Sequence, residues 1–199
     1  LTDPAEILRR LSDELADRNP RGMFVTIQCL VFDFAAGRVS IAGAGHHELA
    51  ILSPGQAPRL AHPSTGLPAG LMPGNSIQSE SIAVSPGDTF VLFSDGVSEA
   101  MNAADDFFGD ERLVATLAPL AEAPTSDIVD AVMAAVRAFA AGAPQSDDIS
   151  VVAASLKKNR LSQPAASGLS RQDPLLEPGT TAREVRPSRS PDPSRSAAT

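Results

Sequence analysis

The stretch TFVLFSDGVSEAMN, from Thr89 to Asn102, decides how the rest of the chain is interpreted. Residues 90–93 form an apolar run of aromatic and branched side chains behind a Pro-Gly-Asp turn signal, which predicts a buried strand. Ser94 ends the run, so that Asp95 stands at the end of a rigid core strand and Gly96 allows the chain to turn at once into a short helix. A carboxylate in this position can bind a hard cation, or it can cap the helix that follows it.

A second acidic segment, QSDDIS, precedes another apolar strand that we predict over Ile149 to Ala153. Adjacent residues on a strand point to opposite faces, so one of Asp147 and Asp148 can face inward while the other faces solvent. Carboxylates at the ends of neighbouring strands would form an oxygen-rich pocket of the kind that Mg²⁺ or Mn²⁺ prefers. The alternative interpretation is that the acid pair belongs to a solvated turn.

These segments together resemble the bacterial PPM-type (PP2C-like) protein serine phosphatases, most closely their SpoIIE/RsbU-like branch. The specific parts of the resemblance are the Ser-Asp-Gly-Val and Asp-Asp-Ile-Ser segments. Weaker supporting segments occur upstream in the order that the family shows, namely Met23 to Thr26, Ala44 to His46 and Gly66 to Gly70. The resemblance extends from about Met23 to Leu156.

The resemblance implies an α+β fold, a PP2C-like β-sandwich of antiparallel sheets flanked by helices, with a two-metal site at one end. The Mn²⁺ or Mg²⁺ ions would activate a water molecule and hold it in line with the departing serine oxygen, so no nucleophilic side chain is required. Carried over by position, Asp95 and Asp147 would be metal ligands. Gly96 would permit the turn at the metal, Asp148 would shape the loop, and His46 would support the site without direct ligation.

One departure from the family pattern limits these expectations. The family's first metal motif, a Gly-Asp-x-x-Asp type segment that supplies the aspartate between both metals, does not occur in the chain, and neither does a Gly-His-Gly segment. Residues 1–22 predict only an amphipathic helix over Pro4 to Asp17. We therefore expect an N-terminally truncated form of the domain, with exposed sheet edges where the first strands are missing and with weak or no activity on its own.

The composition restricts the classes of function. Residues 1–157 hold 9 basic and 20 acidic side chains, and the whole chain of 199 residues has a net charge of −8. Nucleic-acid binding requires a basic footprint and is not expected, whereas an acidic body suits a site that gathers divalent cations. No window of 18 apolar residues occurs, so we expect no membrane span. The single cysteine, Cys29, is interpreted as a core residue in a reducing compartment, which predicts a cytoplasmic location.

The chain divides into two segments of different composition. Residues 1–157 correspond to the partial phosphatase domain, whose predicted helices include 110–120 and Thr125 to Ala140. Residues 158–199 are rich in Pro, Ser and Arg and cannot bury enough apolar surface to offset the entropy of ordering, so we predict a disordered tail.

Two functions of different classes fit these observations. In the first, the complete protein is a metal-dependent serine/threonine phosphatase acting on a phosphorylated regulatory protein, such as a STAS-type anti-anti-sigma factor, and an upstream sensor domain controls it. In the second, the chain is a non-catalytic partner-binding module, a pseudophosphatase in sigma-factor regulation that kept the scaffold and lost the site. Partner binding that is indifferent to Asp95 and Asp147 would favour the second.

Overall fold

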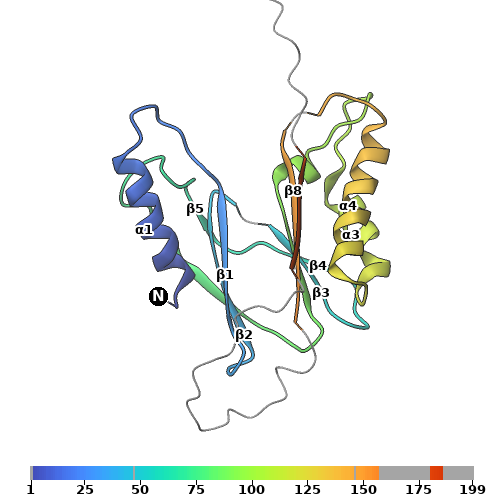
Figure 1. Cartoon of the computed structure of the whole chain (residues 1–199), viewed down its shortest axis with the longest axis horizontal. Helices are drawn as coiled ribbons and strands as arrows, with labels where there is room; N and C mark the ends of the chain where they lie inside the picture. Colours follow the sequence, from blue (N-terminus) through green and yellow to red (C-terminus); the bar gives the residue numbers. More distant parts are fainter. Residues whose placement is uncertain (1, 47, 146, 157–179, 186–199) are drawn as a thin grey trace, which may run out of the picture.

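The fold is a sandwich of four layers, helix on sheet on sheet on helices, as Figure 1 shows. The computed structural model describes residues 2–46, 48–145, 147–156 and 180–185. One outer layer is helix α1 (Pro4–Asp17), and the other contains α3 (Gly109–Leu117) and α4 (Thr125–Ala140). This arrangement confirms the predicted α+β fold with a PP2C-like β-sandwich.

The first sheet is built around a β-hairpin. Its strands are β1 (Ile27–Asp33), β2 (Arg38–Ala44), β5 (Thr65–Gly66) and β6 (Ser79–Ala83). Strand β2 pairs antiparallel with β1 and with β6, but its last two residues pair parallel with β5. The sheet is therefore mixed rather than purely antiparallel. Before β1 begins, Val25 pairs with Ala69 in an isolated antiparallel bridge.

The second sheet places the two acidic segments side by side. Its order is β4-β3-β7-β8-β9, and the strands are β3 (Leu49–Leu52), β4 (Arg59–Ala61), β7 (Thr89–Phe93), β8 (Ile149–Ser155) and β9 (Thr180–Val185). Strands β7 and β8 are antiparallel, with Phe93 opposite Val151. Because of this register, the end of β7 and the beginning of β8 meet at the same edge of the sandwich, where Asp95 and Asp147 follow and precede them.

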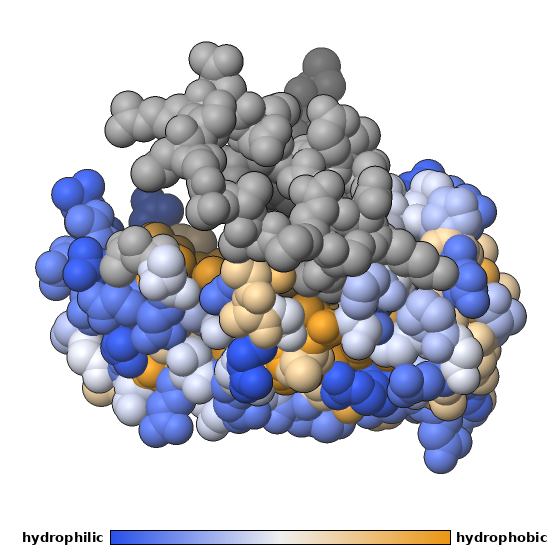
Figure 2. Space-filling model, turned by 90° about the horizontal axis from the view of Figure 1, so that it is seen from below, coloured by the Kyte–Doolittle hydropathy of each residue, from blue (hydrophilic) through white to orange (hydrophobic). Residues whose placement is uncertain are grey.

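Apolar side chains fill the spaces between all four layers. One cluster joins the two sheets and contains Ile41, Ile51 and Phe90, each at most 2% exposed. A larger cluster lies between the second sheet and helices α3 and α4, and a smaller cluster lies between the first sheet and α1. Figure 2 shows that, on the face seen from below, apolar residues gather in the middle and hydrophilic residues border them. Burial of the apolar side chains in the three clusters is the main stabilising contribution to the sandwich.

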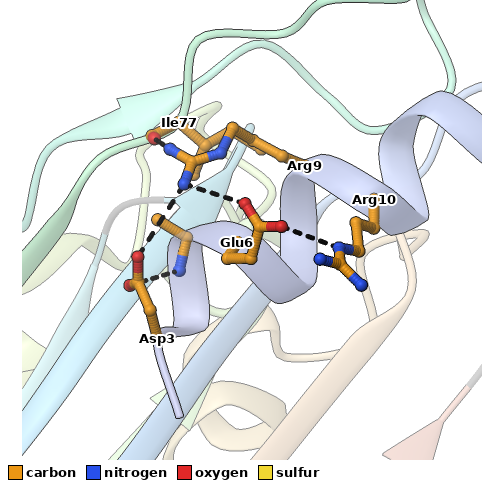
Figure 3. Close-up of polar contacts among 6 residues, drawn as sticks. Asp3, Glu6, Arg9, Arg10 and Ile77 are labelled. Atoms are coloured by element: carbon orange, nitrogen blue, oxygen red, sulfur yellow. Dashed lines mark hydrogen bonds and ion pairs between the residues drawn. The ribbon is translucent and has the colours of Figure 1, made fainter. Parts of the chain in front are cut away.

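Helix α1 is held against the first sheet by its apolar face and by a group of charged residues (Figure 3). Asp3 caps the helix by accepting a hydrogen bond from the Ala5 amide at 3.0 Å. Arg9 donates to the carbonyl of Ile77 at 2.7 Å, which ties the helix to the segment before β6. Glu6 accepts from Arg10 at 2.7 Å and from Arg9 at 3.2 Å, and the hydrogen bond from Arg10 lowers the pKa of the Glu6 carboxyl.

The helices agree with the sequence predictions in two places and differ in two. Helices α1 and α4 have the predicted bounds, since their apolar periodicity is unbroken. The helix predicted over 110–120 is divided into α3 and a 3₁₀ turn, η1 (Ala118–Leu120), because Pro119 cannot continue an α-helical hydrogen-bond ladder. The short helix after β7, α2 (Asp95–Ser98), begins earlier than predicted.

Strand β9 corrects the prediction of disorder for part of the tail. Residues 180–185 pair antiparallel with the far side of β8, with Thr181 opposite Ala153. Two side chains also bind α4, since Thr181 lies 3.1 Å from Thr125 between their hydroxyl oxygens and Arg183 lies 2.5 Å from the Asp130 carboxylate. Strand β9, rather than β8, is therefore an edge of the second sheet. The remainder of 158–199 lies outside the described residues.

Candidate metal centre

The site is built where β7 ends, and Ser94 fixes its backbone. The Ser94 hydroxyl donates to the carbonyl of Asp148 at 2.8 Å and accepts from the amide of Ser150 at 2.9 Å. The Ser94 amide donates to the carbonyl of Ser150 at 2.9 Å. Three hydrogen bonds therefore join Ser94, the residue after β7, to the segment at the beginning of β8. The positions of the two acidic segments are thus coupled.

Gly96 is required at this point by close contact rather than by backbone strain. A Cβ atom at Gly96 would lie 2.4 Å from the carbonyl oxygen of Asp148 and 3.0 Å from its carbonyl carbon. Any larger residue would push the Asp148 backbone away from the beginning of α2. The glycine thus allows the Asp95 turn and the Asp148 segment to pack directly against each other.

Asp95 does not cap a helix through its side chain. Ser94 occupies the N-cap position of α2, and Asp95 is the first helical residue, where a negative charge is favourable. The Asp95 Oδ1 atom accepts a hydrogen bond from the Gly96 amide at 3.0 Å, and the residue is exposed. Its carboxylate is therefore held at the end of a buried strand and is open to solvent.

Asp95 lines a cavity of about 200 Å³ that is rich in carboxylates, which we call the carboxylate cavity. The other described lining residues are Thr26, Gly45, His46, Glu48, Phe93, Ser98 and Glu99. This lining contains three acids and no lysine or arginine. The cavity therefore concentrates negative charge and attracts cations.

The predicted site residues are only partly brought together by the fold. His46 and Asp95 line the carboxylate cavity, whereas neither Asp147 nor Asp148 does. Asp147 is exposed two residues before β8; its Oδ1 atom accepts from the Asp148 amide at 2.7 Å, and its carbonyl accepts from Gln145 at 2.7 Å. The two predicted ligand positions thus lie next to neighbouring strands at one edge of the sandwich, but their carboxylates do not share one cavity.

Sequence reasoning missed two acids of this cavity. Glu99, the C-cap residue of α2, lies four residues after Asp95, so helical spacing could have placed both on the same side of the chain. Glu48 reaches the cavity from the segment before β3, and its carboxylate lies 3.7 Å from Nδ1 of His62. No local pattern distinguishes Glu48 from an ordinary surface acid, because only the packing of the two sheets brings it near Asp95.

The donor atoms fit Mn²⁺ or Mg²⁺ in kind but not in number. Carboxylate and hydroxyl oxygens are the hard ligands that these ions prefer. Within the described parts of the chain, however, no group of three or more His, Cys, Asp or Glu side chains is positioned to hold one ion. The described side chains at this edge of the sandwich thus supply donor atoms of a suitable kind, but not a group that could by itself hold an ion.

Comparisons with known proteins identify the same kind of domain. Residues 1–157 match the family model described as Stage II sporulation protein E (SpoIIE). Protein IcfG of Synechocystis sp. is 34% identical over 127 residues, which cover 63% of this chain and 20% of IcfG. This chain therefore spans a fifth of the length of that relative.

Solved phosphatase domains share the fold. The SiaA-PP2C domain of Pseudomonas aeruginosa superimposes with a TM-score of 0.65 and 22% identity, over 78% of this chain and 60% of that domain. The phosphatase domain of the cell fate determinant SpoIIE from Bacillus subtilis, presoaked with Mn, gives a TM-score of 0.53 and 18% identity, over 67% and 57%. The chain thus spans somewhat more than half of each solved domain. None of the helices in the described part of the chain combines the length and the apolar character that a membrane span requires.

Proposed function

The chain belongs to the SpoIIE family of PPM-type (PP2C-like) phosphatases. On this premise we propose that it is part of a metal-dependent protein serine/threonine phosphatase, which hydrolyses phosphoserine on a regulatory protein. The family match over residues 1–157 and the sandwich fold support a phosphatase domain. The protein substrate, the metal and the residues that bind it are our proposal.

The observation that supports a metal-dependent reaction is the negative charge of the carboxylate cavity. Asp95, Glu48 and Glu99 line it without a lysine or arginine among the described lining residues. A phosphate ester carries up to two negative charges near neutral pH, so it is repelled by this cavity until a cation is bound there. A divalent cation is therefore a precondition for substrate binding as well as for the reaction.

The residues of this chain have distinct tasks in the proposed reaction. Asp95, from the carboxylate cavity, and Asp147, from outside it, would hold the metal, and Ser94 and Gly96 keep the two segments that carry them in contact. A bound Mn²⁺ or Mg²⁺ pair supplies Lewis-acid activation of water and neutralises the charge of the phosphoryl group. Phe93, 3% exposed, is the apolar, buried member of the cavity lining.

The first test is phosphate release from a phosphoserine peptide in the presence of Mn²⁺, measured on the protein that contains this chain. We expect Asp95→Asn and Asp147→Asn to reduce the rate by at least about a hundredfold, since each removes a charge from the metal site. Asp127→Asn is the matched control, because Asp127 is an exposed aspartate at the beginning of α4 and lines neither of the two cavities described here. Undiminished activity in excess EDTA would overturn the proposal.

A second function is supported by one observation. The described residues lack a group of three ligating side chains, which is the arrangement expected of a partner-binding module that has lost its metal centre. In that case a regulatory partner binds equally well to the wild type, to Asp95→Asn and to Asp147→Asn, with or without metal. A partner that binds only in the presence of Mn²⁺ would exclude this alternative.

A further inference from the structure

A second cavity lies directly beside the carboxylate cavity and has the opposite character. Its volume is about 290 Å³, and we call it the side pocket. Most of its lining is apolar and comes from the segment after α2, the last turns of α4 and the segment before β8, including Met101, Val136, Ala140, Ala143, Pro144 and Ile149. This volume is at the lower end of the range for small-molecule sites and suits one or two amino-acid side chains.

Helix α2 is the wall between the two cavities. Asp95 and Ser98 of α2 and Glu99 at its C-cap line the carboxylate cavity. Gly96, in α2, and Ala100, two residues after its end, line the side pocket. Since this short segment stands between the two cavities, we take their separation to be about the width of one helix, roughly 10 Å.

The side pocket also contacts the second predicted ligand segment. Gln145 lines the pocket, and its side-chain amide donates to the carbonyl of Asp147 at 2.7 Å. Gly96, which packs against the Asp148 backbone, lines it from the other side. A ligand that fills the pocket therefore lies against both segments to which we assign metal binding.

Arg137 gives the pocket a charge preference. It is exposed on α4, and of the described residues that line either cavity it is the only lysine or arginine. In a segment of 157 residues with 9 basic and 20 acidic side chains, an arginine at the rim of an apolar pocket selects for a carboxylate on the ligand. Met101 adds a flexible wall that can adjust to different aliphatic side chains.

We propose that the side pocket is a specificity subsite that binds an aliphatic side chain of the phosphorylated protein, with Arg137 pairing to an acidic residue beside it. An extended peptide advances about 3.3 Å per residue, so the aliphatic residue stands roughly three positions from the phosphoserine. The substrate class is thus a phosphoserine segment with a neighbouring aliphatic-acidic pair. This inference rests on the proposed function, because it places the phosphate in the carboxylate cavity.

The test uses short fluorescent peptides that carry a phosphonate analogue of phosphoserine, which binds without being hydrolysed. One peptide has Leu and Glu about three residues after the analogue, a second has them before it, and matched peptides have Ala and Gln instead. With Mn²⁺ present, we expect the better Leu-Glu peptide to bind at least about tenfold more tightly than its Ala-Gln counterpart, which corresponds to burial of one leucine side chain. Equal binding of all peptides to the wild-type protein would overturn the proposal.

Two variants of the protein test the pocket from the other side. Ala140→Leu fills it, and we expect this variant to lose the preference for leucine. Arg137→Gln should weaken binding of the Leu-Glu peptide by up to about fivefold, as expected for a partly exposed ion pair, whereas Arg59→Gln on the distant strand β4 should have no effect. Retention of the full leucine preference by a folded Ala140→Leu protein would contradict the proposal.

A small substrate separates this inference from the proposed function. Neither variant should change kcat or KM for p-nitrophenyl phosphate, which is too small to reach past α2. If the wild-type protein that contains this chain does not hydrolyse p-nitrophenyl phosphate with Mn²⁺, the proposed function fails, and peptide binding still decides whether the pocket selects side chains. If p-nitrophenyl phosphate is hydrolysed and the peptides are not distinguished, only the subsite fails.

Discussion

Replacement of Ser94 by alanine is the sharpest test of how the acidic segments are held together. The Ser94 hydroxyl makes two hydrogen bonds across the strands, to the Asp148 carbonyl at 2.8 Å and from the Ser150 amide at 2.9 Å. Ser94→Ala removes both and leaves one carbonyl and one amide without this partner. The N-cap of α2 is not affected, because the Ser94 side chain makes no capping hydrogen bond.

The magnitude follows from the partial burial of these groups. Each lost hydrogen bond costs about 1 kcal/mol when water can partly replace it, so Ser94→Ala should lower the free energy of unfolding by about 2 kcal/mol. For a chain of this size, that change lowers Tm by roughly 4–8 °C. Urea unfolding followed by circular dichroism measures the change in unfolding free energy. The comparison requires that the slope of this free energy against urea concentration is the same in both proteins.

The matched control for this substitution is Ser98→Ala. The Ser98 hydroxyl donates only to the Asp95 carbonyl within its own turn, at 3.3 Å, and the bond is exposed. We expect a change in unfolding free energy of less than about 0.5 kcal/mol for this variant. If Ser94→Ala were as mild as Ser98→Ala, the account of Ser94 as the connection between β7 and β8 would be wrong.

Three further predictions concern other residues. Gly96→Ala should destabilise the protein by about 1–3 kcal/mol and weaken Mn²⁺ binding in isothermal titration, because its Cβ would lie 2.4 Å from the Asp148 carbonyl; unchanged stability would refute the close contact. The pKa of Glu6 is lowered by its hydrogen bonds from Arg10 and Arg9, so its contribution is present above its unfolded pKa, near 4.5, and is lost as pH falls through the folded value. The difference in Tm between wild type and Glu6→Gln should therefore disappear in acid, and a difference that grows in acid would contradict this sign. Burial raises the pKa of the Cys29 thiol, so a disulfide reagent at pH 8 should react more slowly with the folded than with the urea-unfolded protein, and equal rates would show that the thiol is accessible.

Local patterns in the sequence were sufficient for helices α1 and α4 and for strand β7. Helices α1 and α4 combine uninterrupted helical periodicity with clear end signals, so their bounds could be predicted. Strand β7 could be predicted from its apolar run and its turn signals. In each case the information lies within the element itself.

The features that depend on distant contacts could not be predicted in this way. Strand β9 contains few apolar residues, and its structure depends on pairing with β8 and on side-chain contacts with α4. Glu48 becomes part of the carboxylate cavity only when the two sheets pack together. The role of Ser94 likewise depends on the register of β7 and β8, which brings together residues more than fifty positions apart.

The most direct measurement of the central claim is paramagnetic broadening of amide signals by Mn²⁺, recorded by NMR on isotopically labelled protein. If the acidic segments at the end of β7 and the beginning of β8 bind the metal, signals of residues near Asp95 and Asp147 should broaden first, and Asp95→Asn should abolish this selectivity while Asp127→Asn should not. Uniform broadening, or broadening centred on other acidic residues such as Asp105 and Asp106, would show that the metal site lies elsewhere.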